Sequence, residues 1–249
     1  MPLPPPSPEN KAVLDAAKVW FEEKIIASHV KNTMMLSDVD KFNINPFTVW
    51  YLAKFTDNEV TPRSIAKALI LPRALGSSIA TSLGTNLQRF ITDTLVTAYG
   101  SAASGMDIDF KDRRDGLNKY SQLKLGPNTI NKDDVKTIND KFKGVQNLLK
   151  ANGQSLSKSH FAIGIMFGEE SEVNSWYREL RDEHGWELYV GKDFWWRLTG
   201  DEDFLDRLVD VIQNSTESSA ASSALESTIQ KLSKDPRIQK LAFEFNQGV

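Results

Sequence analysis

The 249-residue chain contains no cysteine, and its three histidines lie far apart in the sequence. Without thiols the chain can form neither a disulfide nor a thiolate metal site. His29, His160 and His184 lack the close spacing of histidine ligands in zinc sites. A zinc enzyme and a disulfide-stabilised secreted domain are therefore not expected.

Long apolar runs are absent as well, since no segment approaches the roughly 18 to 20 residues that cross a bilayer. The N-terminal sequence MPLPPPSPENK has prolines where a secretory signal would have a basic stretch and then an apolar one. With 40% hydrophobic and 25% charged residues, the composition is typical of a soluble globular domain. We therefore expect a cytoplasmic protein that does not associate with membranes.

Three common catalytic signatures are missing. The sequence contains neither a Walker phosphate-binding loop nor a glycine-rich dinucleotide fingerprint. It also lacks the nucleophile elbow that presents a reactive serine. The sequence therefore does not support a reaction that depends on ATP or NAD, or hydrolysis by a nucleophilic serine.

Positive charge does not exceed negative charge over the whole chain, but it is locally concentrated. The net charge of −3 argues against a protein that coats nucleic acid with its whole surface. Residues 111–150, however, contain ten Lys and Arg against five Asp. An enzyme that reads DNA needs only such a local positive surface. The lysines of residues 132–150 also fit the solvated face of a helix, although their position after Lys124 favours phosphate contact for some of them.

The pattern of a β-hairpin is present in residues 105–131, GMDIDFKDRRDGLNKYSQLKLGPNTIN. Asp107 and Asp109 are two residues apart, so on a strand both side chains point to one face. The neighbouring apolar side chains are expected on the opposite, buried face: Met106, Ile108 and Phe110. Asp115-Gly116 is a typical turn dipeptide, and the alternation resumes after it.

On the second strand of this hairpin, Gln122 and Lys124 share a face. Closing the hairpin about its turn brings that face to the one that carries the two aspartates. Two or three oxygens hold a hard divalent cation, and a neighbouring ammonium group can stabilise a pentavalent phosphate or help to deprotonate the attacking water. The pattern therefore predicts a metal-dependent nuclease site.

The hairpin resembles the active site of the PD-(D/E)xK nuclease superfamily, and within it that of the type II restriction endonucleases. Other segments are similar to enzymes that cut GGNCC-type sites and follow the same order: NINPF at 43–47, TSLGTNLQRF at 81–90, LKLG at 123–126 with TI at 129–130, and YVGKDFW at 189–195. The resemblance covers roughly residues 40–200. It implies double-stranded DNA as substrate, Mg²⁺ as cofactor with Mn²⁺ as a substitute, and a cognate DNA methyltransferase that acts on the same site without forming a stable complex.

This chain departs from the superfamily at two positions, where Gln122 and Gln88 replace the usual acids. An amide oxygen still coordinates a hard cation but brings no charge, so metal affinity would depend more on Asp107, Asp109 and the DNA phosphate. Asp107 is the preferred counterpart of the superfamily aspartate, because it follows Gly-Met and precedes an apolar residue. The resemblance implies that both aspartates and Gln122 bind metal, and that Lys124 orients or activates the water.

Two polar segments are candidates for DNA contact. Thr85 and Asn86 follow Gly84 on the helix expected before the hairpin, where they can donate to phosphates. Beyond Lys124 lie four more candidates: Asn128, Thr129, Asn131 and Lys132. For both segments, ordinary helix capping and turn formation is an equally good reading.

Hydrophobic periodicity predicts helices over residues 10–29, 62–71, 79–98, 131–149, 192–198, 204–212 and 223–245, and further strands over 161–167 and 186–190. The expected fold is mixed α/β, a PD-(D/E)xK core with a mixed sheet flanked by helices and extra helices at both ends. The predicted regions are a Pro-rich tail (1–9), a helical DNA-binding and dimerisation region (10–100), a catalytic core (101–214), and a linker with a C-terminal helix (215–249).

The favoured hypothesis is a homodimeric type II restriction endonuclease that cuts a short palindromic DNA site and leaves 5′-phosphate ends. A two-fold symmetric site has two equivalent scissile phosphates, which favours one active site per strand. The apolar faces of the terminal helices are the expected dimer surface, with ordinary packing inside the chain as the alternative. Three other hypotheses stay open: a repair or junction nuclease of the same superfamily, a catalytically silent DNA-binding relative, and an unrelated α/β protein.

Overall fold

The structure, a computed structural model, describes residues 4–78, 86, 90–96, 105–216 and 220–248. The chain divides into two compact units. The sheet unit contains Met1–Val19 and Leu87–Asn214, and the helical unit contains Trp20–Asn86 and Ser215–Val249. The candidate active-site hairpin lies entirely in the sheet unit.

Four strands form one mixed sheet in the order β1-β2-β3-β4. They are β1 (Ile108–Lys111), β2 (Asn118–Lys124), β3 (Phe161–Ile165) and β4 (Glu187–Val190). β1 pairs antiparallel with β2, whereas β2 and β3, and β3 and β4, pair parallel. The expected mixed sheet and both expected later strands are therefore confirmed.

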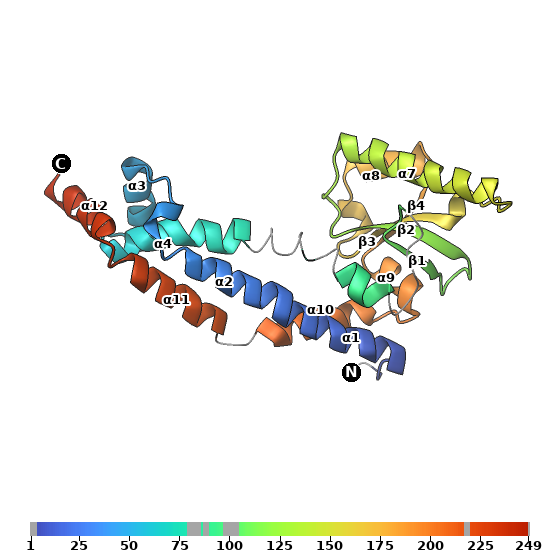
Figure 1. Ribbon diagram of the computed structural model, residues 1–249, viewed down its shortest axis with the longest axis horizontal. Helices are drawn as coiled ribbons and strands as arrows, with labels where there is room; N and C mark the ends of the chain where they lie inside the picture. The colour runs from blue at the N-terminus through green and yellow to red at the C-terminus, as the bar shows by residue number, and fades with distance from the viewer. Residues whose placement is uncertain (1–3, 79–85, 87–89, 97–104, 217–219, 249) are drawn as a thin grey trace. The chain divides into compact units, whose positions relative to one another are not determined.

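Helices cover both faces of this sheet (Figure 1). They are α7 (Lys132–Ala151), α8 (Ser175–Asp182) and α9 (Lys192–Thr199), and α10 (Phe204–Thr216) follows α9, where Phe204 stacks on Trp195. On one face, Phe142 of α7 and Tyr177 of α8 belong to the same buried cluster as Phe161 and Ile163 of β3. On the other face, Phe194 of α9 lies so close to Gly164 that a Cβ there would be 2.5 Å from its ring. Burial on both sides explains why β3 reads as one continuous apolar run.

The hairpin closes about the predicted turn. Asp112 and Leu117 are joined across it by a backbone hydrogen bond of 2.9 Å, and Gly116 has a φ of +74°, which favours glycine. Phe110 contacts the ring of Phe194 on the α9 side. Met106, however, lies before the strand begins and packs in the cluster with α7. Its expected place beside Ile108 and Phe110 was therefore wrong, because strand alternation starts only at Ile108.

A buried charge network fixes the same turn. The Lys119 ammonium, 1% exposed, donates to Asp115 Oδ2 at 2.6 Å, and Arg197 donates to Asp112 Oδ2 at 2.8 Å. Burial alone would raise the pKa of Asp115, but the hydrogen bonds from Lys119 and from the Leu117 N–H outweigh it and lower that pKa. Each buried cation of the turn thus has a carboxylate partner, which makes the hairpin a rigid support for the polar face of β2.

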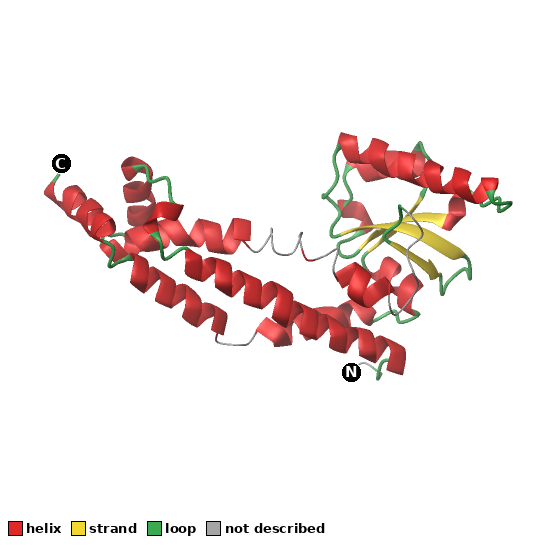
Figure 2. Cartoon of the chain, viewed as in Figure 1, coloured by secondary structure: helices red, strands yellow, loops and turns green. Residues whose placement is uncertain are grey.

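The helical unit contains no strand among the described residues (Figure 2). Its elements are η1 (Phe21–Ile26), α2 (Ala27–Met35), η2 (Val39–Lys41), α3 (Pro46–Asp57), α4 (Pro62–Pro72), η3 (Arg73–Ser78), α11 (Ala220–Leu232) and α12 (Pro236–Gln247). α3 was not predicted, although Asn45 caps it and Pro46 occupies its first turn. The single helix expected over 223–245 was also wrong, because Pro236, which has no N–H, starts a new helix capped by Asp235.

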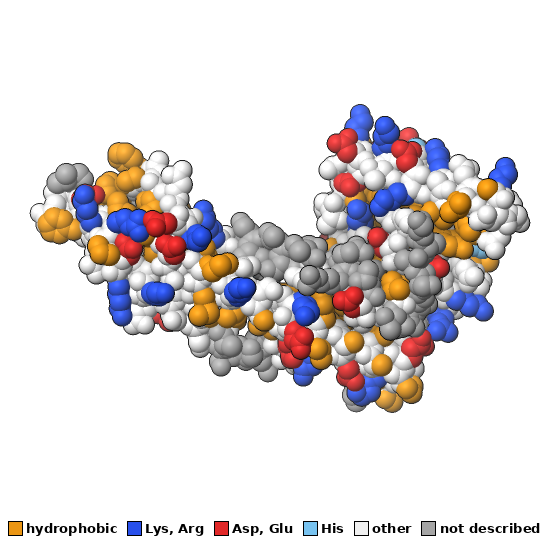
Figure 3. Space-filling model, in the orientation of Figure 1, with side chains coloured by type: hydrophobic (Ala, Val, Ile, Leu, Met, Phe, Trp, Pro, Cys, Tyr) orange, Lys and Arg blue, Asp and Glu red, His pale blue; other side chains and the backbone are white. Residues whose placement is uncertain are grey.

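The apolar residues of the C-terminal helices pack inside their own unit. Ile229, Leu232 and Ile238 are 3%, 0% and 0% exposed and share a cluster with α3 and α4. They are therefore not available as a dimer surface. The exposed apolar side chains of this unit gather instead over α3 and α12 (Figure 3), and include Phe47, Tyr51, Phe55 and Phe243.

The remaining described helices belong to or adjoin the sheet unit. They are α1 (Pro8–Trp20), η4 (Ile91–Leu95) and two short 3₁₀ turns, η5 (Lys158–His160) and η6 (Glu170–Glu172). α1 begins inside the expected Pro-rich tail, and its Asn10 donates to the Thr199 carbonyl at 3.4 Å. In the part of the chain that the structure describes, no helix combines the length and apolar character that a membrane crossing needs.

Candidate active site

The first element of the site is Asp107, which directly precedes β1. Its backbone N–H donates to the Ser121 carbonyl at 2.9 Å. Its carboxylate accepts from the Leu123 N–H, at 2.8 Å from Oδ2. Leu123 stands between Gln122 and Lys124, so the structure brings Asp107 against the strand that carries both of these residues. Among the residues that the structure describes, Oδ2 is the oxygen of this carboxylate that accepts a hydrogen bond.

Asp109 lies opposite Tyr120 in the hairpin register, on the face covered by α7. Its Oδ1 is buried and has no hydrogen-bond partner among the described residues. Burial raises the pKa of Asp109, and a hydrogen bond from its own backbone offsets this only in part. A desolvated carboxylate oxygen without a donor is costly by itself but suits a cation. The two aspartates therefore fit the divalent metal that the sequence implies.

The raised pKa of Asp109 predicts a stability effect. Because the folded-state pKa exceeds the unfolded one, folding is penalised at neutral pH, and the penalty disappears as pH falls below both values. We expect Asp109→Asn to stabilise the metal-free protein by about 0.5–1 kcal/mol at pH 7.5, with no difference near pH 3.5. Urea unfolding in EDTA measures this, and Asp140→Asn, an exposed acid on α7, is the control. A destabilised Asp109→Asn would show that the carboxylate is already satisfied.

Gln122 is 3% exposed and engaged at both ends of its amide. Its Nε2 donates to the Gly105 carbonyl at 3.0 Å, and its Oε1 accepts from Lys141 Nζ at 2.9 Å. Gln122 thus connects three parts of the site: the segment before Asp107, the centre of β2 and the middle of α7. A cation could bind Oε1 only if Lys141 withdrew from it.

Lys124 ends β2 with its side chain 26% exposed, and its Nζ lies 3.9 Å from Asp134 Oδ1. Asp134 belongs to the first turn of α7, where its Oδ2 accepts from the Asn131 N–H in a capping box. The ion pair is long, so Asp134 orients the ammonium group but offsets little of its positive charge. Lys124 is therefore free to face a phosphate or a water molecule.

Of the four residues proposed for DNA contact after Lys124, three lie on the loop that leads into α7 and Lys132 is the first residue of that helix; all four are exposed. Thr129 Oγ1 donates to the Gly126 carbonyl at 2.9 Å, and Asn131 Oδ1 caps α7. Their side chains are engaged in the loop itself, whereas Asn128 and Lys132 project outward. Tyr177 donates to the same Gly126 carbonyl at 3.1 Å, and burial raises its pKa to about 12. The loop is thus held in place by α8.

The other DNA-contact candidates belong to the segment before the hairpin. Thr85 lies outside the described residues. Asn86 is described and is half-buried, and its carbonyl accepts from the Trp20 indole at 3.2 Å within the helical unit. Because the two units are not positioned relative to each other, the structure does not test whether Asn86 lies near the hairpin.

Among the described residues, the structure shows no group of three or more His, Cys, Asp or Glu that could hold a metal ion. The acidic ligands predicted from the sequence stay at two, Asp107 and Asp109, and amide, water or phosphate oxygens would have to complete the shell. Mg²⁺ keeps several waters and often binds through only one or two carboxylates plus substrate phosphate. A site with two acids is thus compatible with that ion.

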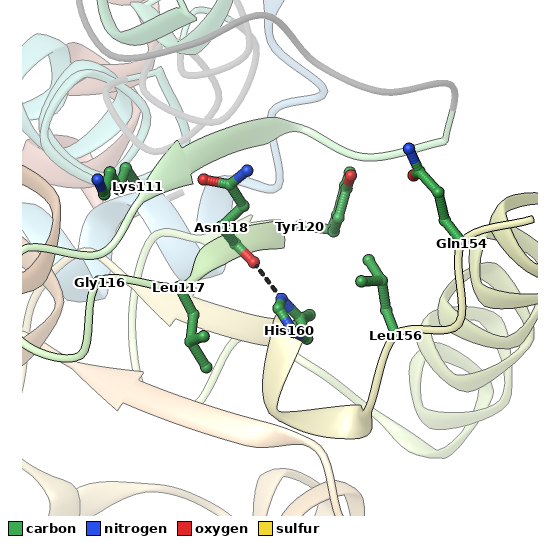
Figure 4. A pocket seen from close by; sticks show the side chains of 8 residues that line it. All are labelled: Lys111, Gly116, Leu117, Asn118, Tyr120, Gln154, Leu156 and His160. Carbon is green, nitrogen blue, oxygen red and sulfur yellow. Dashed lines mark hydrogen bonds between the residues drawn. The ribbon is translucent and has the colours of Figure 1, made fainter.

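A polar recess of about 570 Å³ opens beside the turn end of the hairpin (Figure 4). Tyr120 and Gln154 contribute to its lining, as does His160, whose Nδ1 is 2.8 Å from the Asn118 carbonyl. None of the four catalytic candidates lines this recess. His160 is therefore satisfied by the backbone, in agreement with a structural role.

Sequence reasoning missed two residues of α7 that complete the site, Asp134 and Lys141. They are seven residues apart, which is about two helical turns, so they lie on one side of the helix. Each contacts a different candidate, Asp134 the ammonium of Lys124 and Lys141 the amide of Gln122. The sequence offers no local signal for either residue, because the helix carries several other lysines and acids at similar positions.

Comparison with known proteins identifies the family of the chain. The family described as type II restriction endonuclease EcoO109I matches residues 17–219, which is most of the chain. No curated protein matches it. The mixed four-stranded sheet flanked by helices is consistent with the fold of that family. The chain belongs to the EcoO109I family of type II restriction endonucleases.

Proposed function

We propose that the protein is a Mg²⁺-dependent endonuclease that hydrolyses both strands of a short palindromic, GGNCC-like DNA site and leaves 5′-phosphate ends. One observation carries the proposal. The hairpin gathers Asp107, Gln122 and Lys124 on neighbouring backbone positions, and the unpartnered, buried Oδ1 of Asp109 lies on the same face. Such a combination of acids and an ammonium group suits phosphodiester hydrolysis.

In this proposal each side chain has a separate task. Asp107 and Asp109 hold the metal, and Gln122 Oε1 is a third candidate oxygen once it is released by Lys141. A bound Mg²⁺ would polarise the phosphodiester and make a coordinated water more acidic. Lys124 holds its ammonium group toward the attacking water and the phosphate, and the Asp134 carboxylate orients it. The exposed Asn128, on the loop after β2, and Lys132, in the first turn of α7, contact the DNA backbone.

A catalytically silent DNA-binding relative is the second candidate. It is favoured by the amide at Gln122, whose oxygen is engaged by a lysine and not by a cation. Such a protein would bind a specific sequence and cut nothing, and its cognate DNA methyltransferase would have no protective role.

Digestion of a phage genome of known sequence separates these functions. A discrete fragment pattern in Mg²⁺, unchanged in Mn²⁺ and absent in EDTA, is the expected result, and end mapping gives the site and the 5′-phosphates. DNA methylated within that site should resist cleavage. Cleavage only at junctions or lesions would favour a repair nuclease, and specific binding without cleavage would favour the silent relative.

A further inference from the structure

Helix α7 places two charged side chains, Asp134 and Lys141, against the polar face of β2. Asp134 lies beside Lys124 at the end of the strand, with 3.9 Å between Nζ and Oδ1. Two turns later, Lys141 Nζ lies 2.9 Å from Gln122 Oε1. The residues between and after them on this side of the helix, Ile138 and Val145, are buried in the core. The helix is therefore anchored, and its two charged side chains are held over the hairpin.

The amide of Gln122 has a defined orientation. Its Nε2 must face the Gly105 carbonyl, because an oxygen there would meet another acceptor. Its Oε1 must then face Lys141, which can only donate. The amide therefore acts as an acceptor for an ammonium group, and each of the two contacts enforces the other.

The partner of Lys141 is neutral, unlike the partners of the two buried cations at the hairpin turn, Lys119 and Arg197. Lys119 donates to a carboxylate of the turn, and Arg197 pairs with three carboxylates, those of Asp112, Asp115 and Asp193. Among the residues that the structure describes, Lys141 forms no ion pair. Its charge is thus fully available to an incoming anion, and its exposed side chain can turn toward that anion without leaving a carboxylate unpaired.

We propose that Lys141 binds the scissile phosphodiester as a second ammonium group beside Lys124, and that Gln122 is the positioning residue that holds it there. This inference rests on the proposed nuclease function. Lys141 would form no covalent bond and transfer no proton. It would stabilise the negative charge that develops on the phosphate oxygens during hydrolysis. A glutamate at position 122 would neutralise this charge, which gives the amide a purpose that a metal ligand alone does not.

A double-mutant cycle that combines a Lys141 variant with a modified DNA phosphate tests the contact between Lys141 and the scissile phosphate through binding affinity alone. The probes are two duplexes that contain the mapped cleavage site, one natural and one with a neutral methylphosphonate at the scissile position, both measured in EDTA. Lys141→Met keeps the length of the side chain and removes its charge. We expect it to weaken binding of the natural duplex about tenfold and binding of the methylphosphonate duplex hardly at all. Lys143→Met, an exposed lysine of the same helix, is the matched control.

Cleavage gives the second measurement. Single-turnover cleavage in Mg²⁺ should fall about 100-fold for Lys141→Met, recover in part for Lys141→Arg and stay unchanged for Lys143→Met. Gln122→Glu should also slow cleavage without raising Mn²⁺ affinity in calorimetry, because the new carboxylate pairs with Lys141.

Two results would overturn the inference while the nuclease proposal stands. One is equal binding loss on both duplexes together with wild-type cleavage by Lys141→Met. The other is a higher Mn²⁺ affinity and undiminished cleavage in Gln122→Glu, which would make position 122 a metal ligand. A wild-type protein that cuts no DNA would instead remove the proposed function itself, whatever the variants do.

Discussion

Replacing Lys124 by alanine is expected to reduce DNA cleavage by about 1,000-fold or more while specific binding stays within about tenfold of wild type. A group that acts mainly in the transition state affects the rate far more than the affinity for the ground state. The fold should tolerate the change, because the side chain is partly exposed and Asp134 keeps its capping hydrogen bond to Asn131. Single-turnover cleavage and gel-shift titration measure the two quantities.

The matched control is Lys111→Ala, which removes an exposed lysine from β1 of the same hairpin. It should leave the cleavage rate close to wild type. If Lys124→Ala cuts at a near wild-type rate, the hairpin is not the active site, and the assignment of all four residues fails with it.

Asp107 requires a different substitution, because its carboxylate also accepts the Leu123 N–H. Alanine would remove this support together with any metal ligand, whereas asparagine keeps an acceptor of nearly the same shape. Loss of cleavage in an Asp107→Asn protein with an unchanged melting temperature would therefore report on the metal and not on the fold. This distinction follows from the structure and not from the sequence pattern.

The hairpin was predictable because its signals are local. Strand alternation, the Asp115-Gly116 turn and the Gln-x-Lys spacing all act over a few residues, and the observed register agrees with them. The buried run of β3 and the cap of α7 at Asn131 are equally local. In these segments backbone preference and burial favour the same structure, so the pattern is sufficient.

Contacts between distant segments could not be predicted in the same way. Lys141 reaches Gln122 only after α7 has packed on the sheet, and nothing in the periodicity of that helix distinguishes it from the solvated Lys143. The turn network that joins Asp112 to Arg197 spans 85 residues of sequence. The helix α8 was also not predicted.

The packing partners of the C-terminal helices likewise could not be predicted from the sequence pattern. Amphipathic periodicity shows that one face of a helix is buried but not against what. In the structure α11 packs with α2 and α4 inside the helical unit, so its apolar face is not available to a second subunit. The predicted dimer therefore has to be tested through its DNA cleavage.

Hybrid dimers provide that test. A palindromic duplex has two equivalent scissile phosphates related by a two-fold axis, and one chain has one hairpin, so the simplest enzyme is a C2 homodimer with one active site per strand. We expect sedimentation of the DNA-bound protein to show about twice the 28.0 kDa chain mass. A dimer that combines one wild-type and one Lys124→Ala subunit, isolated through two different tags, should convert a supercoiled single-site plasmid mainly to the nicked circle.

The wild-type dimer should linearise the same plasmid under the same conditions, and the double Lys124→Ala dimer should leave it supercoiled. The nicked product is diagnostic, because each active site has access to only one strand of the bound duplex. Linear product from the hybrid at the wild-type rate would mean that a single hairpin cuts both strands. A protein that sediments as a monomer on DNA and still breaks both strands in one binding event would exclude the dimer and favour a nuclease that acts on non-palindromic substrates.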